Sequence, residues 1–326
     1  MFVVKEINEN IVNLAWNKSK NASLFCHPLL IKNLGYNARY VGGYKNNELI
    51  VIWPLVMINN SFSKPPLFSY YFGPYWVENK YQTTPYKMFK NNLEIFNKLI
   101  PFVQSISPKL VFSLTPEFLD LRPFQWFNYN RDDKSKFNID LKYTALYDLK
   151  KINTTEDLIL SFRSDDKRKK ARKILKEKKF QIVFKKTKET DKYINLYKNS
   201  LYRSGGKINN DEIYALEKIL SISNSNSKFN NSVQIEVLEL YIDESPIIHG
   251  FQLLLTGKDK VYALTQCVSD EARELNGSVA LTLNALIFSK QKYSFFDFNG
   301  ANSPLRADDK HSYSADIVSY FELSIS

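Results

Sequence analysis

The second half of the chain has an order of predicted elements that few folds accommodate. Apolar periodicity predicts a helix pair in residues 155–179, a strand at 180–186 and two more helices. Three consecutive strands follow between residues 233 and 269, then a helix over 278–291 and the strands "SFFDFNG" and "DIVSYFELSIS". Helices that interrupt a run of strands in this way predict a mixed sheet with helices on its faces.

The first half repeats this order in different residues. "RYVGGYK" and "ELIVIWPLVMI" predict a hairpin around a tight turn at residues 45–47, residues 83–107 have helical spacing, and "KLVFSLTP" is the next strand. We therefore predict an α/β fold in two domains, residues 1–147 and 148–326, which are alike in element order and unlike in sequence.

Composition restricts the class of protein. With 326 residues, 44% of them hydrophobic, the chain can bury a large core, and it has no run of about 18 apolar residues that would predict a membrane span. Charges and amides interrupt the apolar positions of the N-terminal segment, which argues against a secretory signal. Cys26, Cys267 and three scattered histidines provide neither a disulfide framework nor zinc-ligand spacing. We expect a cytoplasmic protein without a metal site.

The formal charge of +11 favours an anionic partner such as a phosphate, a nucleotide, tRNA or an anionic membrane surface. A lysine-rich solvated surface is the alternative. The densest basic stretch, residues 163–186, has twelve Lys or Arg against three acids. It is either a solvated helix face or a contact with tRNA phosphates or acidic head groups.

A series of short segments lies in a recognisable order along nearly the whole chain. They are "LFCHPLLIKNLG", "VGGYKNNELIVIWPL", "LFSYYFGPYW", "YTALYDL", "SFRSDDKRKKARKILKEKKFQI", "LYKNSLYRSGG" and "FDFNGANSPLRADDKHSYSA". Together they resemble the Gcn5-related N-acetyltransferase (GNAT) superfamily. More closely, they resemble its double-GNAT branch, which contains the Fem peptidoglycan-bridge (FemAB-like) aminoacyltransferases and the BioF2-like or CelD-like acyltransferases.

This resemblance implies tandem GNAT-like domains with mixed central sheets, a degenerate first domain and a catalytic second domain. The implied enzyme is an N-acyltransferase that transfers an acyl group from acyl-CoA, acetyl or longer, to an amine. Its acceptor would be a nucleotide- or lipid-linked sugar or peptide precursor of the cell envelope, with peripheral membrane contact as a further expectation. Aminoacyl-tRNA is the second donor that the resemblance implies.

The sequence also departs from the pattern of the resembled proteins. GNAT enzymes usually hold the CoA pyrophosphate on an Arg/Gln-x-x-Gly-x-Gly/Ala turn, whereas this chain has "ARELNGSVALTL", with Ser278 after Gly277. The amides of Gly277 and Ser278 remain the predicted cofactor-binding groups. Thr115-Pro116 replaces an Asp-Pro that is frequent in Fem-type enzymes. A GNAT scaffold that has lost its donor site and only binds anions is the non-enzymatic alternative.

In GNAT folds the fourth and fifth strands part, and free backbone amides there meet the donor. The resemblance places this gap between "KVYALTQC" and "SFFDFNG", so that the polar segment after it forms the acceptor wall. The predicted catalytic residues are Tyr262, Asp297, Asn299 and Lys310. Lys310 either polarises the acyl carbonyl or neutralises a phosphate, or it is a surface lysine beside Asp308 and Asp309.

The other candidate residues have two interpretations each. Asp297 either accepts a hydrogen bond from the acceptor amine or caps a turn, and Tyr262 either donates to the acyl oxygen or packs. Strand periodicity places Gln266 on the same face as Tyr262, and Arg203 suits an anionic group or an ordinary helix end. The predicted substrate-binding residues are Arg203, Gln266, Arg306 and Asp308.

Overall fold

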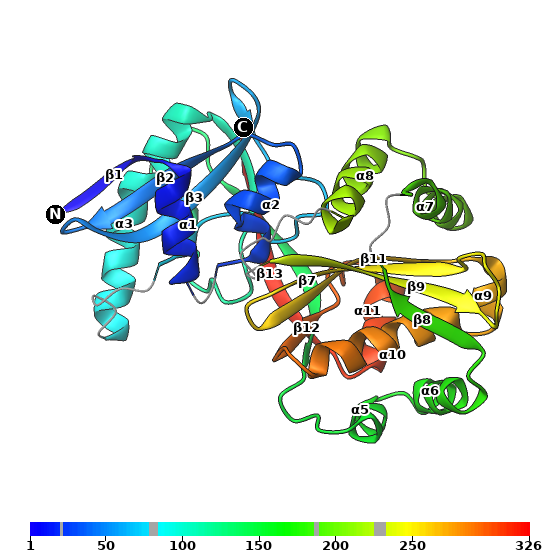
Figure 1. Cartoon of the computed structure of the whole chain (residues 1–326). Helices are drawn as coiled ribbons and strands as arrows, with labels where there is room; N and C mark the ends of the chain where they lie inside the picture. Colours follow the sequence, from blue (N-terminus) through cyan, green and yellow to red (C-terminus); the bar gives the residue numbers. More distant parts are fainter. Residues whose placement is uncertain (20–21, 78–83, 186–188, 225–232) are drawn as a thin grey trace. The chain divides into compact units, whose positions relative to one another are not determined.

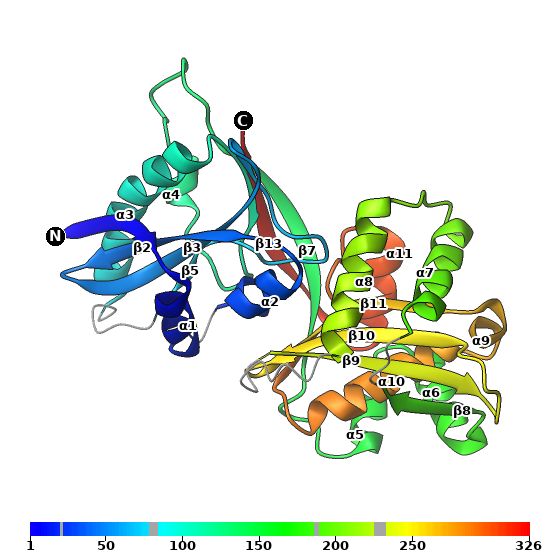
Figure 2. The same cartoon turned by 45° about the horizontal axis from the view of Figure 1, so that its top comes forward.

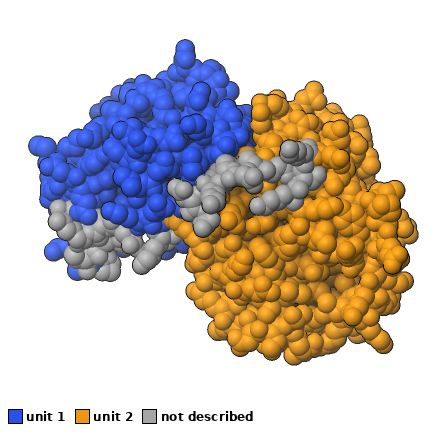
Figure 3. Space-filling view, viewed as in Figure 1, with its two compact units in different colours: residues 1–142, 319–326 blue, residues 143–318 orange. Residues whose placement is uncertain are grey.

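The computed structural model describes residues 1–19, 22–77, 84–185, 189–224 and 233–326. The chain forms two compact units (Figure 3): unit 1 comprises Met1–Lys142 with Ser319–Ser326, and unit 2 comprises Tyr143–Val318. This division differs from the expected boundary at residue 147 and moves residues 319–326 to the first part. The reason is backbone pairing, because the end of the last strand joins the sheet of unit 1.

Unit 1 contains a mixed sheet in which β1, β2 and β3 pair antiparallel, β4 pairs parallel with β6, and β6 pairs antiparallel with the end of β13. In Figure 2, α1 and α2 lie on one face of β1–β3 and α3 lies on the other. The strands of unit 1 are β1 (Phe2–Ile7), β2 (Ala38–Lys45), β3 (Glu48–Asn59), β4 (Phe62–Ser63), β5 (Tyr75–Trp76) and β6 (Lys109–Ser113). Two further strands belong partly to each unit: β7 (Asn138–Asp148) begins in unit 1, and β13 (Asp316–Ile325) ends in it. The helices are α1 (Glu9–Asn17), the 3-10 helix η1 (Leu24–Cys26), α2 (Pro28–Asn33), α3 (Pro85–Ile106) and α4 (Arg122–Gln125).

Local sequence explains two predicted elements of unit 1. The hairpin between β2 and β3 turns at Asn46 and Asn47, whose φ angles of 48° and 67° match a turn with two left-handed residues. Helix α3 begins after Thr84, whose side chain accepts from the amide of Lys87, with Pro85 at its first position. Both elements are confirmed, and the apolar face of α3 packs on β3 in the core of the unit.

Unit 2 contains a sheet with the order β8-β9-β10-β11-β12-β7, antiparallel except for the parallel pair β11–β12. Figure 1 shows α7 and α8 on one face of this sheet and α5, α6 and α10 on the other. The strands are β8 (Phe180–Phe184), β9 (Gln234–Ile242), β10 (Gly250–Gly257), β11 (Lys260–Val268) and β12 (Phe295–Asp297). The helices are α5 (Thr155–Ser161), α6 (Asp165–Glu177), α7 (Asp191–Arg203), α8 (Asn210–Asn224), α9 (Asp270–Glu274), α10 (Gly277–Lys290) and α11 (Pro304–Ser312).

The predicted α/β class with mixed sheets flanked by helices is confirmed. Helix α10 is apolar on nearly every side and lies in the main core cluster of unit 2, where Leu281 and Leu286 are fully buried. Helix α11 was not expected, because the segment between the last two strands reads as polar and irregular. Pro304 at the first helical position starts it.

A buried carboxylate fastens α7 to the sheet. Glu239 of β9 is fully buried and accepts hydrogen bonds from the hydroxyls of Tyr193 and Tyr241. Lys192 Nζ of α7 lies 2.7 Å from its Oε1 atom. Burial alone would raise the pKa of Glu239, but the hydrogen bonds from Lys192, Tyr193 and Tyr241 outweigh it and lower this pKa. The group is therefore held as a carboxylate.

Candidate functional site

Strands β11 and β12 of unit 2 pair over a short distance and then part. Their parallel register joins Lys260 to Phe295, Val261 to Phe296 and Tyr262 to Asp297, where β12 ends. β11 continues to Val268, and no strand in the described ranges pairs with residues 263–268 on the side of β12. The expected gap between these two strands is therefore present.

Asp297 stands at the point where the strands part. It is 2% exposed, and its carboxylate accepts hydrogen bonds from the hydroxyl of Thr144 and, at 2.8 Å, from the amide of Asn299. The second bond closes a turn over two residues, as Asp side chains commonly do. Asp297 thus caps the turn that directs the chain away from β11.

Asn299 lies in the gap itself. It is 1% exposed and has a φ of 52°, a left-handed conformation that Asn tolerates better than most residues. Its Nδ2 atom donates to the carbonyl oxygen of Ala263 at 2.9 Å, while its buried Oδ1 atom has no hydrogen-bond partner in the described ranges. A buried polar atom without a partner is costly, so this oxygen is an acceptor that a ligand can satisfy.

Lys310 reaches back from α11 to the same turn. Its ammonium group donates to the carbonyl oxygens of Asn299 and Gly300, the latter at 2.7 Å. Two charge-assisted bonds to consecutive carbonyls hold the turn in its left-handed conformation. Lys310 therefore acts on the gap through Asn299 and Gly300.

Tyr262 and Gln266 lie on opposite faces of β11, so the prediction that they share a face is wrong. The register with β10 shifts between Leu253 and Leu254, because Leu264 is an extra residue in β11. Tyr262 pairs with Leu255 and Gln266 pairs with Gln252, and these partners belong to opposite faces of β10. Gln266 Nε2 donates to the carbonyl oxygen of Ser278 at 3.1 Å and to Thr282, which ties β11 to α10.

In the described part of the chain, no hydrogen bond or ion pair joins Asn299 to Arg203 or Asp308. Arg203, at the end of α7, donates to the carbonyl oxygen of Val268 at 2.8 Å and to the carboxylate of Asp270 at 3.1 Å. Asp308 is an exposed residue of α11. Arg306 belongs to the same helix, but its side chain lies outside the described part of the chain.

Gly277 and Ser278 begin α10, as the phosphate-turn prediction requires. As the first residues of a helix, their amides have no helical carbonyl partner. A Cβ atom at position 277 would lie 2.8 Å from the carbonyl oxygen of Ala272, so close packing against α9 also requires this glycine. A small pocket of about 70 Å³ adjoins the preceding Asn276, and its lining contains both lysines and glutamates: Lys170, Lys173, Lys179, Glu177 and Glu274.

Two buried residues with polar contacts near the site, Thr144 and Tyr313, were not among the predicted site residues. The side chain of Thr144 on β7 is fully buried and holds Asp297 across 153 residues of chain. Tyr313, after α11, is 2% exposed; burial raises its pKa well above the usual range, and Lys167 Nζ donates to its hydroxyl at 3.2 Å. Spacing along the sequence could not reveal either pair, since the partners come from distant segments.

Ion pairs neutralise much of the basic stretch on α6. Acidic partners lie within 4 Å of Lys167, Arg168, Lys170, Arg172 and Lys173. These contacts favour the solvated-face interpretation of the helix over an extended phosphate-binding track.

Comparison with known proteins was made by sequence and by structure. No family model and no curated relative match the sequence. The structure of FemX superposes with a TM-score of 0.69 over 98% of this chain and 96% of FemX, at 12% identity. A tandem GNAT protein from the clavulanic acid biosynthesis pathway gives 0.54 over 100% of this chain and 98% of that protein, at 8% identity.

The chain has the tandem GNAT fold. L-PGS from Bacillus licheniformis is a further structural neighbour, with a TM-score of 0.54 at 12% identity over 98% of this chain and 92% of its own. The double-GNAT architecture expected from the sequence segments is thereby confirmed. Among the described residues, no helix has the length and apolar character needed to cross a bilayer.

Proposed function

We propose that the protein is an N-acyltransferase whose catalytic part is unit 2 and whose unit 1 is a degenerate GNAT-like domain. One observation carries this proposal: β11 and β12 part after three paired residues, and the buried Oδ1 atom of Asn299 in the gap has no hydrogen-bond partner among the described residues. The pantetheine arm of acyl-CoA carries amide N–H groups, which such an oxygen would accept. Residues 264–268 of β11, beyond the carbonyl of Ala263 that Asn299 occupies, would pair with the same arm from the other side.

In the proposed reaction a neutral amine attacks the thioester carbonyl carbon. The new C–N bond forms as the carbonyl oxygen gains negative charge, which donors in the gap would stabilise. Collapse of this intermediate breaks the C–S bond, and the proton lost by the amine leaves with CoA as its thiol. Tyr262 lies beside Asp297 in the register and is the candidate donor to the oxyanion. Asp297 and Lys310 are positioning residues, because their polar atoms hold the turn.

The donor is acyl-CoA in this proposal, with its pyrophosphate on the amides of Gly277 and Ser278. Aminoacyl-tRNA is the second candidate donor, supported by the Fem resemblance of the sequence and by the structural likeness to FemX. The acceptor is an amine of a sugar- or peptide-containing cell-envelope precursor, met in the cytoplasm. Arg203, Gln266, Arg306 and Asp308 remain candidates for binding it.

Isothermal titration calorimetry with acetyl-CoA, palmitoyl-CoA and charged tRNA tests this function. We expect saturable binding of an acyl-CoA, and release of CoA thiol from it when an amine such as D-glucosamine or L-lysine is present. If only charged tRNA binds, aminoacyl-tRNA takes the place of acyl-CoA as the proposed donor. Absence of heat with every donor would leave only an anion-binding scaffold and contradict the enzymatic assignment.

A further inference from the structure

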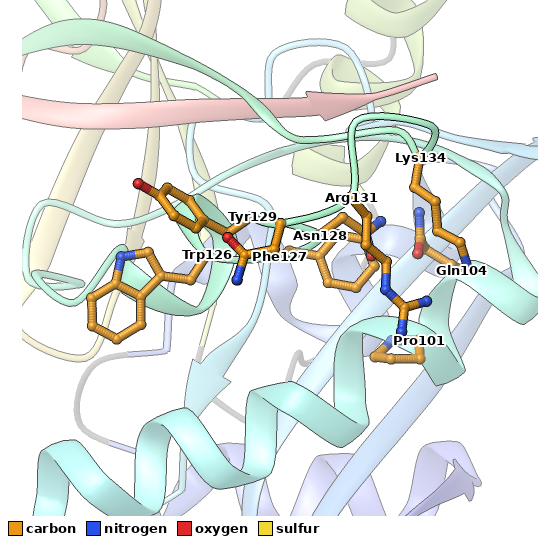
Figure 4. A pocket seen from close by; sticks show the side chains of 9 residues that line it. Pro101, Gln104, Trp126, Phe127, Asn128, Tyr129, Arg131 and Lys134 are labelled. Atoms are coloured by element: carbon orange, nitrogen blue, oxygen red, sulfur yellow. The ribbon is translucent and has the colours of Figure 1, made fainter.

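Unit 1 contains an open pocket of about 570 Å³, formed by α3 and the segment after α4 (Figure 4). This volume falls within the range of small-molecule sites, roughly 300–1,000 Å³. The residues that line the pocket combine three carboxamides, three aromatic side chains, two cations and a proline, with no acid among them: Pro101, Gln104, Trp126, Phe127, Asn128, Tyr129, Asn130, Arg131 and Lys134.

One end of the pocket is cationic. Figure 4 shows Arg131 and Lys134 extending toward Gln104 and Pro101 of α3. Neither cation has an acidic partner in the described ranges. The nearby Asp132 forms an ion pair with Lys136 instead, with 2.8 Å between Oδ1 and Nζ. Two unneutralised cations beside a carboxamide suit a phosphate or carboxylate group.

The other end of the pocket offers aromatic surface. Trp126 is 50% exposed and Tyr129 is 69% exposed, which is unusual for side chains of this size. The guanidinium of Arg122 lies 5.6 Å from the centre of the Trp126 ring and is itself fixed by two hydrogen bonds to Asp120, at 2.7 and 2.8 Å. The indole is thus supported on one side and leaves a flat surface for a ligand.

The segment that carries these groups is held in shape. Asn128 adopts a left-handed φ of 55°, and its Nδ2 atom donates to the carbonyl oxygen of Ser135 at 2.9 Å. The backbone amide of Arg131 donates to the carbonyl oxygen of Asn128 at 3.0 Å. A preformed loop loses less entropy when a ligand binds.

We propose that this pocket binds an anionic sugar, that is, a pyranose carrying a phosphate or a carboxylate. The anionic group would lie on Arg131 and Lys134, the apolar face of the ring would stack on Trp126, and the carboxamides, which both donate and accept, would pair with hydroxyls. We favour a sugar over a nucleobase because three carboxamides line the pocket and match the several hydroxyl groups of a sugar. The site consists of unit 1 residues alone and is independent of the proposed acyl transfer in unit 2.

Tryptophan fluorescence gives a local test. Of the four tryptophans, Trp16 and Trp53 are at most 1% exposed, Trp76 is half-buried and Trp126 is 50% exposed, so Trp126 is the tryptophan most accessible to acrylamide. We expect glucose 1-phosphate and glucuronate to protect Trp126 with saturation. Glucose or inorganic phosphate alone should bind at least tenfold more weakly than glucose 1-phosphate.

A matched pair of lysine variants provides the control. Lys134→Ala should weaken glucose 1-phosphate binding at least fivefold, whereas Lys136→Ala, in the same loop and with the same charge loss, should not. Trp126→Phe keeps a ring and should retain binding, as measured by calorimetry, while Trp126→Ala should lose it. Far-UV circular dichroism checks that each variant is folded.

Three outcomes would overturn this inference. They are equal affinity of Lys134→Ala and the parent protein, protection by AMP that exceeds protection by glucose 1-phosphate, and no saturation by any sugar probe. None of them depends on acyl-CoA binding, so failure here and failure of the acyltransferase proposal are distinguishable.

Discussion

Asn299 and Ala263 are joined by a hydrogen bond of 2.9 Å, from the side-chain Nδ2 atom to the backbone carbonyl, across the gap between β12 and β11. This bond fixes the carboxamide so that its Oδ1 atom stays buried in the gap. The side chain therefore takes the place of a strand partner on one residue of β11 and leaves the following residues unpaired on that side.

Replacing Asn299 by glycine tests the role of its carboxamide. Glycine accepts the φ of 52° without strain, so Asn299→Gly should remain folded and bind acetyl-CoA about tenfold more weakly, the effect of losing one hydrogen bond of about 1.4 kcal/mol. Calorimetry measures the affinity. Asn47→Gly is the control, since Asn47 has a φ of 67° in a hairpin of unit 1 and should not alter binding.

Removing the charge of Lys310 should loosen the turn after Asp297. We expect Lys310→Met to weaken acetyl-CoA binding about fivefold, because the carbonyls of Asn299 and Gly300 lose their charged donor, and Lys310→Arg to restore part of the affinity. Lys290→Met is the comparison, because Lys290 also donates to a backbone carbonyl, that of Asn153 at 3.0 Å. Equal affinities of the two methionine variants would contradict the positioning role.

The buried Glu239 should make stability depend on pH. Its pKa is lowered in the folded protein, so its contribution is present above the unfolded value, about 4.3, and is lost as the pH falls through the folded value. Glu239→Gln should lower the free energy of unfolding by about 3 kcal/mol at pH 7, since Lys192 loses its buried partner. Urea titrations at pH 7 and pH 3 measure this difference, which should shrink at the lower pH. Glu244→Gln, at an exposed position, should have little effect at either pH.

Cys267 should be unreactive in the folded protein. Burial raises the pKa of its thiol to about 11, so little thiolate exists at pH 8. Iodoacetamide followed by mass spectrometry should label Cys267 only after unfolding in urea.

The same thiol should affect stability at high pH. Because its folded pKa exceeds its unfolded pKa, about 8.5, this group makes the free energy of unfolding fall as the pH rises from about 9 to 11. The decrease in the free energy of unfolding should be smaller in Cys267→Ala. In the labelling experiment, rapid modification of Cys267 in the native protein would contradict its burial.

Element order was predictable from the sequence because it depends on local patterns. Three features show this: the helix start at Thr84–Pro85, the turn at Asn46–Asn47 and the apolar runs of β9, β10 and β11. Each of them depends only on residues that are close together in the sequence. The gap between β11 and β12 was expected from a resemblance, and the residues around its opening, Tyr262, Asp297 and Asn299, were among those predicted.

Side-chain geometry was not predictable in the same way. One extra residue, Leu264, leaves the apolar pattern of β11 readable but reverses the faces of Tyr262 and Gln266. The partner of Asp297, Thr144, comes from a strand in a distant segment. No sequence pattern indicated that the aromatic segment around Trp126 forms a short helix and a loop with an exposed indole.

The antiparallel pairing of β6 with residues 322–325 has a consequence for how the chain folds during synthesis. Leu323 and Ile325 enter the core of unit 1 at less than 4% exposure, so that core stays incomplete while the ribosome makes all of unit 2. Until then β6 lacks its C-terminal partner strand, and that edge exposes unpaired backbone groups.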